Sequence, residues 1–209
     1  MFGDGSLTFR EFIMREPLPL ATIQDAVLEF LRGRTDAVLF GAQAVNAYVD
    51  ESRMTQDVDI LSPRAAELAE ELRAHLAARF QIAVRIRTVA DGLGYRLDQL
   101  RKPKDRHLAA VRRVAGLPAH QVVDNVLVVP PADLICQKVV SRVSRSGTAK
   151  STLDLADIYR LLLTFPELKT REGPVAERLR DSGAPESALE AWREIAAQEI
   201  VAEDDDEGY

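Results

Sequence analysis

The stretch FGAQAVNAYVDESRMTQDVDIL, residues 40–61, decides the fold of this protein. A short apolar run that is stopped by a glycine indicates a buried strand at Asp36 to Phe40. Ala42 to Val49 is rich in alanine and predicts a short helix that packs on a sheet. After a polar loop from Asp50 to Gln56, acidic and apolar residues alternate over Asp57 to Leu61, which predicts a second strand. Strand, helix and strand therefore follow one another closely.

Two acids on the second strand are the candidate metal ligands. Asp57 and Asp59 are two positions apart, so on a strand they project from one face, about 6 to 7 Å apart. Both carboxylates can therefore reach one divalent cation, and hard oxygen ligands suit Mg²⁺ or Mn²⁺. Gly41 begins the preceding helix, where unsatisfied backbone N–H groups without a Cβ nearby can approach a triphosphate. The pattern predicts a metal and phosphate site of the kind used in phosphoryl or nucleotidyl transfer.

The rest of the first 131 residues predicts more strands and two long helices. Apolar residues at helical spacing predict helices at Ile23 to Leu31, with Thr22 as the N-cap, and at Arg64 to Phe80. Alternating or β-branched segments predict strands at Gln81–Val89, Tyr95–Leu100 and Val122–Val129, with a turn at Asp91-Gly92. The segment His107 to Val114 fits either a strand or a short helix.

From Ala132 onward the pattern is helical. One helix begins at Ala132, a second covers Thr152 to Leu163, and two more lie within Glu172 to Val201, separated by Ser182-Gly183-Ala184-Pro185. Strands that come early and helices that come late favour an α+β (mixed α/β) fold, a mixed sheet flanked by helices with a C-terminal helical part. The expected organisation is a core over 1–131, a helical part over 132–201 and an acidic, disordered tail over 202–209.

The two motifs resemble those of a known group of enzymes. Phe40 to Ala44 and Arg53 to Leu61 look like the glycine turn and the acid-x-acid strand of the polymerase-β-like nucleotidyltransferase superfamily. The form Arg-x-Thr-x-Asp-x-Asp, followed by a later Lys138 helix and an Asp154-x-x-Asp157 helix, is similar to AbiEii-type nucleotidyltransferases of toxin–antitoxin and phage-defence systems. The resemblance covers about Val38 to Leu163.

The resemblance implies an activity and assigns residues to it. It implies transfer of a nucleoside monophosphate from an NTP to an RNA, protein or small-molecule acceptor, with Mg²⁺ or Mn²⁺ held by Asp57 and Asp59. It implies a toxin or antitoxin protein as a partner. It assigns nucleotide binding to Gly41, Ala42, Arg53, Thr55 and Lys138. It assigns support of the site to Asp154 and Asp157.

Several of these residues also have an ordinary structural interpretation. Lys138 fits a solvated helix lysine, and Asp154 and Asp157, on one helix face, fit charges that complement a helix dipole. Ala42 departs from the group's usual second glycine or serine, which predicts weaker phosphate binding.

The third carboxylate of active members, a general base or further metal ligand, has one candidate here. Asp98 lies in the middle of a predicted strand among apolar neighbours and could face the pair and activate the acceptor hydroxyl. If the neighbouring strand is instead His107 to Val114, its central position is Ala110 and the third acid is absent. In that case the protein could act as a catalytically impaired binding partner, and this alternative stays open.

Composition excludes several other classes of protein. The single Cys136 cannot form an internal disulfide, the first residues lack a signal-peptide pattern, and no apolar run is long enough to span a membrane, so a cytoplasmic setting without a membrane is expected. Net charge is −6, and five acids in Glu203–Glu207 leave the rest near neutral, which gives no general case for nucleic-acid binding. Basic residues do cluster at 96–113 and 138–150, so an RNA-binding module stays a third interpretation. The three histidines, His75, His107 and His120, are scattered and are expected to be structural.

Overall fold

Seven strands form one mixed sheet in this computed structural model, which describes residues 19–201. Its order is β3-β4-β5-β2-β1-β7-β6. Strands β1 and β7 run parallel, as do β2 and β5, and the other neighbours are antiparallel. The strands are β1 Val38–Phe40, β2 Val58–Ser62, β3 Val84–Val89, β4 Gly94–Gln99, β5 Arg106–Arg113, β6 Gln121–Val123 and β7 Val126–Val128.

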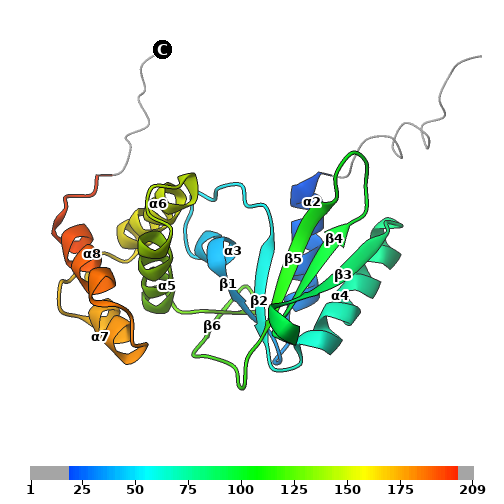
Figure 1. Cartoon of the computed structure of the whole chain (residues 1–209), viewed down its shortest axis with the longest axis horizontal. Helices are drawn as coiled ribbons and strands as arrows, with labels where there is room; N and C mark the ends of the chain where they lie inside the picture. Colours follow the sequence, from blue (N-terminus) through cyan, green and yellow to red (C-terminus); the bar gives the residue numbers. More distant parts are fainter. Residues whose placement is uncertain (1–18, 202–209) are drawn as a thin grey trace, which may run out of the picture.

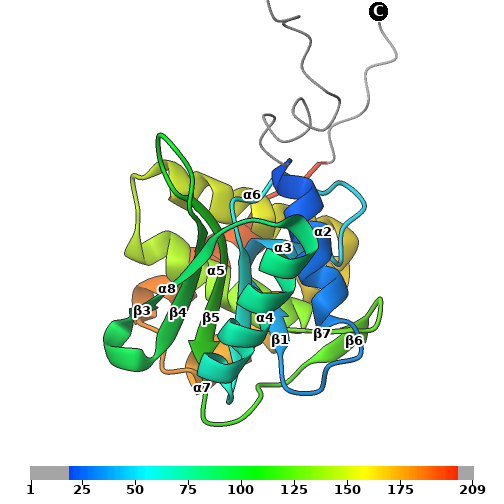
Figure 2. The same cartoon turned by 90° about the vertical axis from the view of Figure 1, so that its right-hand side faces the viewer.

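Helices cover the sheet unequally on its two sides. On one side α2 (Leu20–Leu31) and α4 (Ala65–Phe80) pack against the strands (Figures 1 and 2). On the other side lies α3 (Gly41–Asn46), which contacts the helical part. That part consists of α5 Pro131–Ser144, α6 Ala149–Thr164, α7 Pro174–Asp181 and α8 Glu186–Ala197. Two 3₁₀ turns lie at Ala90–Gly92 and Pro166–Leu168. The mixed α/β class with late helices is confirmed.

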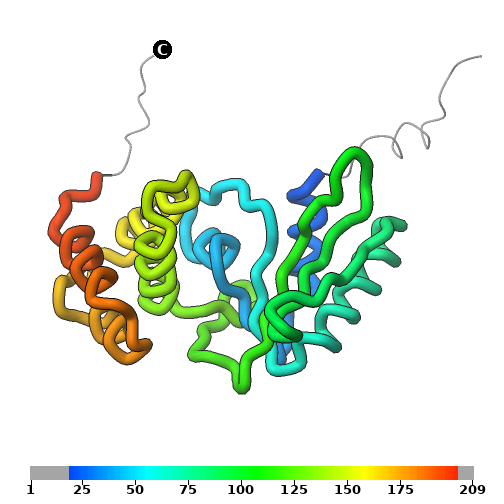
Figure 3. Tube along the Cα trace, viewed as in Figure 1, coloured from blue at the N-terminus to red at the C-terminus, as the bar shows by residue number. Residues whose placement is uncertain are grey.

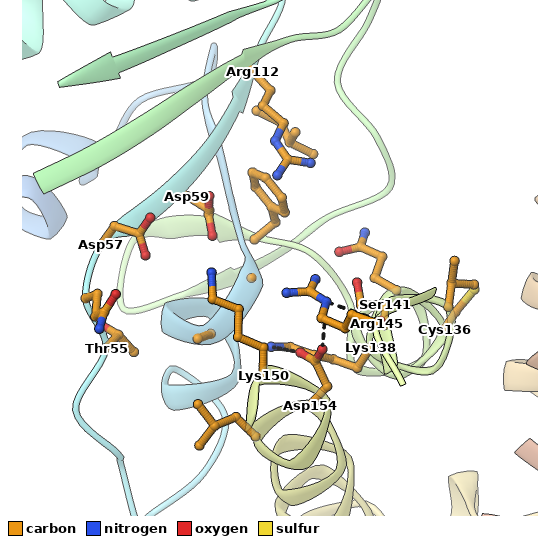
Figure 4. A pocket seen from close by; sticks show the side chains of 18 of the residues that line it. Thr55, Asp57, Asp59, Arg112, Cys136, Lys138, Ser141, Arg145, Lys150 and Asp154 are labelled. Carbon is orange, nitrogen blue, oxygen red and sulfur yellow. Dashed lines mark hydrogen bonds and ion pairs between the residues drawn. The ribbon is translucent and has the colours of Figure 1, made fainter. Parts of the chain in front are cut away.

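The alternation in β2 separates the core from the site. Val58 and Ile60 are fully buried, whereas Asp57 and Asp59 face the opposite side of the sheet, toward α3 (Figure 4). Side chains such as Leu68 from α4 complete the apolar layer. A strand with a period of two thus buries one row of side chains and presents the acids from the other.

Two local predictions differ from the structure. Helix α2 begins at Leu20 with Pro19 at the N-cap position, so Thr22 lies inside the first turn and does not cap the helix. The segment from Val122 to Val129 is not one strand but the hairpin β6–β7. Its turn residues Asp124 and Asn125 both have positive φ, the conformation that a two-residue hairpin loop requires and that Asp and Asn tolerate.

The segment His107 to Val114, which by sequence fits a strand or a short helix, forms the strand β5, and β5 lies between β4 and β2. The acidic tail at 202–209 and the first residues of the chain lie outside the described residues. Across the described part, no helix combines the length and apolar character needed to cross a membrane.

Candidate functional site

A cavity of about 1290 Å³ lies between β2 and α3 on one side and the helices α5 and α6 on the other. Asp57 and Asp59 line it from the sheet, together with Gly41 and Ala42 at the start of α3. Figure 4 shows both carboxylates directed into the space that faces α6. The structure therefore places the glycine turn and the acid pair in one cavity.

Gly41 permits the close approach of Asp59 to the helix start. Its φ is +74°, and a Cβ at this position would lie 2.5 Å from Oδ2 of Asp59. Any other residue would be strained and would collide with the carboxylate. The sequence predicts that Gly41 lets a phosphate come close to the backbone. In the structure its lack of a Cβ also leaves space for the Asp59 carboxylate.

The two carboxylates have different electrostatic surroundings. A hydrogen bond from His107 lowers the pKa of Asp57 despite partial burial. Burial, with the nearby charge of Asp57 as the second cause, raises the pKa of Asp59 to about 6. Arg112, on the neighbouring strand β5, opposes that rise, and its guanidinium stacks on the Phe40 ring 4.9 Å from the ring centroid. At neutral pH the pair therefore carries one firmly ionised carboxylate and one that is easily protonated.

Asp98 does not lie beside the acid pair. Strand β5 separates β4 from β2, and Ala110 is the residue opposite Asp59. Asp98 is buried, and both its oxygens are engaged: Oδ1 lies 3.1 Å from Nδ1 of His107 and Oδ2 accepts from Nε of Arg87 at 2.6 Å. Burial alone would raise the pKa of Asp98, but these two bonds outweigh it and the pKa is lowered. Direct activation of an acceptor hydroxyl by Asp98 does not fit this placement.

His107 is a site residue that was not predicted from the sequence. Its Nε2 lies 3.0 Å from Oδ2 of Asp57, so the ring bridges Asp57 and Asp98. It had been expected to be structural because no motif or spacing connects it to either acid. The one signal in the sequence is its place at the start of a segment, His107 to Val114, that fits a strand.

Arg53 and Thr55 anchor the loop before β2. Arg53 donates to both oxygens of Asp157 on α6, at 2.6 and 2.8 Å, and Figure 3 shows this loop rising beside α6. The Thr55 hydroxyl accepts from Gln24 on α2 and donates to Gln43 on α3, both at 2.9 Å. Both residues line the cavity, but their polar groups are engaged in holding the loop.

Lys138, Asp154 and Asp157 form a buried ionic cluster. The Lys138 ammonium lies 3.2 Å from Oδ1 of Asp154 and 2.6 Å from Oδ2 of Asp157. Burial opposes ionisation of Asp157, but Arg53 and Lys138 outweigh it and lower the pKa of this carboxyl. The solvated interpretation of Lys138 is wrong, because its side chain is buried with both acids, and of the two acids Asp154 lines the cavity.

Other cations are better placed to meet an anion in the cavity. Lys150, at the start of α6, extends toward Asp57 and Asp59 (Figure 4), and its charge contributes to lowering the pKa of Asp57. Arg145 and Arg112 also line the cavity. All three belong to the basic clusters at 96–113 and 138–150, and none of them was predicted to be a site residue.

The residues present fit a divalent cation that keeps other ligands. Within residues 19–201, no group of three or more His, Cys, Asp and Glu side chains is arranged to enclose a metal ion. Mg²⁺ in nucleotide enzymes is commonly held by one or two carboxylates, with water and substrate phosphate completing the octahedron. Asp57 and Asp59, which are close enough to perturb each other and are surrounded by cations, match that donor set.

Comparisons with known proteins identify the fold. No protein-family model and no curated protein matches the sequence. Among solved structures, JHP933 from Helicobacter pylori matches with a TM-score of 0.57 and 15% identity, over 91% of this chain and 92% of that one. A proposed nucleotidyltransferase from H. pylori matches with a TM-score of 0.57 and 16% identity, over 93% and 86%. The polyadenylate synthase of Megavirus matches with a TM-score of 0.53 and 13% identity, over 70% of this chain and 32% of that protein.

At these identities the likeness concerns the fold alone. The chain has a nucleotidyltransferase-like fold, as the motif resemblance implied. The narrower resemblance to AbiEii-type proteins stays a prediction.

Proposed function

We propose that this protein is a divalent-metal-dependent nucleotidyltransferase that moves a nucleoside monophosphate from an NTP to an acceptor. The observation that carries the proposal is the pair Asp57 and Asp59 at a cavity whose opposite wall supplies Lys150 and Arg145. Carboxylates on one side and cations on the other match a metal-bound triphosphate, whose phosphates need both kinds of neighbour. A cavity of about 1290 Å³ has room for a nucleotide and part of an acceptor.

Each residue has a distinct task in this proposal. Asp57 and Asp59 hold Mg²⁺ or Mn²⁺, which when bound neutralises charge on the reacting phosphate. Lys150, Arg145 and Arg112 orient the triphosphate and stabilise charge that develops on it. The Lys138 cluster, with Arg53, holds the loop before β2 against α6 so that both walls keep their spacing. The acceptor is RNA, protein or a small molecule.

The test is transfer of label from each of four α-³²P-labelled NTPs, with Mg²⁺ or Mn²⁺, to total RNA or to proteins and small molecules of a cell extract. Transfer that is lost in Asp57→Ala/Asp59→Ala and retained in Asp25→Ala, a change of an exposed acid on α2, supports the proposal. The class of labelled product identifies the acceptor. No transfer from folded protein with any metal and acceptor overturns it.

The setting of this activity follows from the motif resemblance. The Arg-x-Thr-x-Asp-x-Asp pattern ending at Asp59 supports a toxin–antitoxin component that acts in the cytoplasm, where NTPs are available, and that has a cognate protein partner. Growth arrest on expression, relieved by Asp59→Ala, would support a toxin. Unimpaired growth at high expression would contradict that role and leave the transferase assay to decide the chemistry.

A second candidate function is binding without catalysis. It is favoured by one observation: Ala110 lies opposite Asp59, so the strand next to β2 supplies no carboxylate at that position. Nucleotide binding without label transfer, under conditions in which the protein is folded, would support this candidate over the enzyme.

A further inference from the structure

We infer that His107 is a positioning residue for the metal site, and that Asp98 and Arg87 hold its ring so that Nε2 fixes the Asp57 carboxylate. The inference rests on the proposed function, because it concerns the metal ligands of that site. It assigns a role to His107 and Arg87, to which the resemblance gives none, and a different role to Asp98.

Polar contacts between side chains form a continuous hydrogen-bond chain from the edge of the sheet to the cavity. Nε of Arg87 on β3 donates to Oδ2 of Asp98 at 2.6 Å, and Nδ1 of His107 lies 3.1 Å from the other Asp98 oxygen. Nε2 of His107 then reaches Oδ2 of Asp57 at 3.0 Å. Ionised carboxylates only accept hydrogen bonds, so a ring nitrogen that carries a hydrogen donates to the carboxylate beside it.

Burial restricts the inner members of this hydrogen-bond chain, whereas Arg87 at its outer end is 48% exposed. The Asp98 side chain is 3% exposed and that of His107 is 17% exposed, while Asp57, at 33%, opens toward the cavity. The bond from His107 uses one oxygen of Asp57, which leaves the other oxygen for a metal ion. A ligand with one oxygen tied to a buried partner cannot rotate freely, which is how outer-shell groups prepare a metal site.

A β-bulge between β4 and β5 brings His107 to this place. Leu97 pairs with Ala109 and the next residue, Asp98, pairs with His107, so Leu108 is an extra residue on β5. An extra residue reverses the alternation of side chains, and therefore His107 points to the same face as Asp98 and the acid pair. Leu108 itself is fully buried. Without the bulge, a regular strand would turn His107 to the opposite face.

This hydrogen-bond chain supplies a polar partner for Asp57 from β5, although the β5 residue opposite Asp59 is Ala110, which has no polar side chain. Both ring nitrogens of His107 face carboxylates, so His107 holds one ligand in position and leaves metal binding to Asp57 and Asp59.

The test uses Mn²⁺ binding to the full-length protein, measured by electron paramagnetic resonance. We expect Asp98→Asn and His107→Ala to weaken Mn²⁺ binding about 10- to 100-fold, the usual loss when a residue supporting a metal ligand is removed. His107→Gln, whose amide nitrogen can replace Nε2 as a donor to Asp57, should recover most of that loss. His120→Ala, at a histidine whose Nδ1 bonds to the Pro118 carbonyl, is the matched control and should bind as the wild type does.

A second measurement does not depend on metal. In the metal-free protein, ¹⁵N signals of the His107 ring should shift in both Asp98→Asn and Asp57→Asn, while those of His120 stay unchanged. Wild-type binding of Mn²⁺ with equal binding by Asp98→Asn and His107→Ala would overturn the inference and leave the proposed function standing. Failure of the wild type to bind Mn²⁺ would overturn the proposed function, and the positioning role with it. Unshifted His107 signals would refute the bridge directly.

Discussion

Replacement of Asp59 by asparagine should stabilise the fold at neutral pH, although it removes a proposed metal ligand. Burial and the charge of Asp57 raise the pKa of Asp59 from 3.8 to about 6. A carboxyl group whose pKa is higher in the folded state than in the unfolded state destabilises the fold when it is ionised. The amide has the same shape and no charge, so the change removes this cost.

The size follows from the shift. One pKa unit corresponds to about 1.4 kcal/mol, so a rise from 3.8 to about 6 destabilises the native protein by about 3 kcal/mol above pH 6. The unfolded state is ionised above about pH 4 while the folded state still holds its proton, so the cost grows from pH 4 to pH 6 and is then constant. The gain in Asp59→Asn should therefore be full at pH 8, about half as large at pH 5 and absent below about pH 4.

The assay is urea denaturation followed by circular dichroism in EDTA at pH 5 and pH 8. Asp57→Asn is the contrasting variant, because the bond from His107 lowers the pKa of Asp57 and its charge stabilises the fold above its unfolded pKa. It should be less stable than the wild type at pH 8. Added Mg²⁺ should stabilise the wild type and have less effect on Asp59→Asn. An Asp59→Asn variant that is no more stable than the wild type at pH 8, or whose gain does not depend on pH, would refute the reasoning.

Three further changes test the surroundings of the pair. Asp157→Ala should lower the free energy of unfolding by about 3 to 5 kcal/mol, as measured by thermal and urea unfolding. The change leaves the buried Lys138 with one carboxylate partner and removes both hydrogen bonds from Arg53 to Asp157. Gly41→Ala should cost about 1 to 2 kcal/mol from its positive φ alone and should also weaken Mn²⁺ binding, because the new Cβ displaces Asp59; a variant with wild-type stability and binding would contradict this. Lys150→Ala should leave stability unchanged and weaken NTP binding about 10-fold or more, as measured by calorimetry with the exposed Lys104→Ala, outside the cavity lining, as control.

Much of the secondary structure is local information. Each of these signals lies within a few consecutive residues: the alternation of Asp57 to Leu61, the helical spacing of Arg64 to Phe80, and the Gly183 and Pro185 that precede α8. Such patterns reflect which side of an element is buried, and they predicted the elements to within a few residues. The β6–β7 hairpin was missed because Asp124-Asn125 lacks the glycine that usually marks a two-residue turn.

The site could be predicted only in part, because only some of its contacts join residues that are close in the sequence. Gly41, Asp57 and Asp59 belong to neighbouring elements, so their meeting follows from a short connection. The partners of Lys138 lie one helix further along the chain, and neither their burial nor their pairing has a local pattern.

By itself the sequence determined that β2 carries two acids on one face and that a glycine precedes them, because a strand has a period of two and a glycine stops the short apolar run before it. Only the tertiary structure decided that β5, not β4, lies beside β2, and that an extra residue on β5 turns His107 toward Asp57. The physical reason is that strand order and register arise from hydrogen bonds between segments some fifty residues apart (Val58 pairs with Ala109), for which no short stretch of sequence carries a signature.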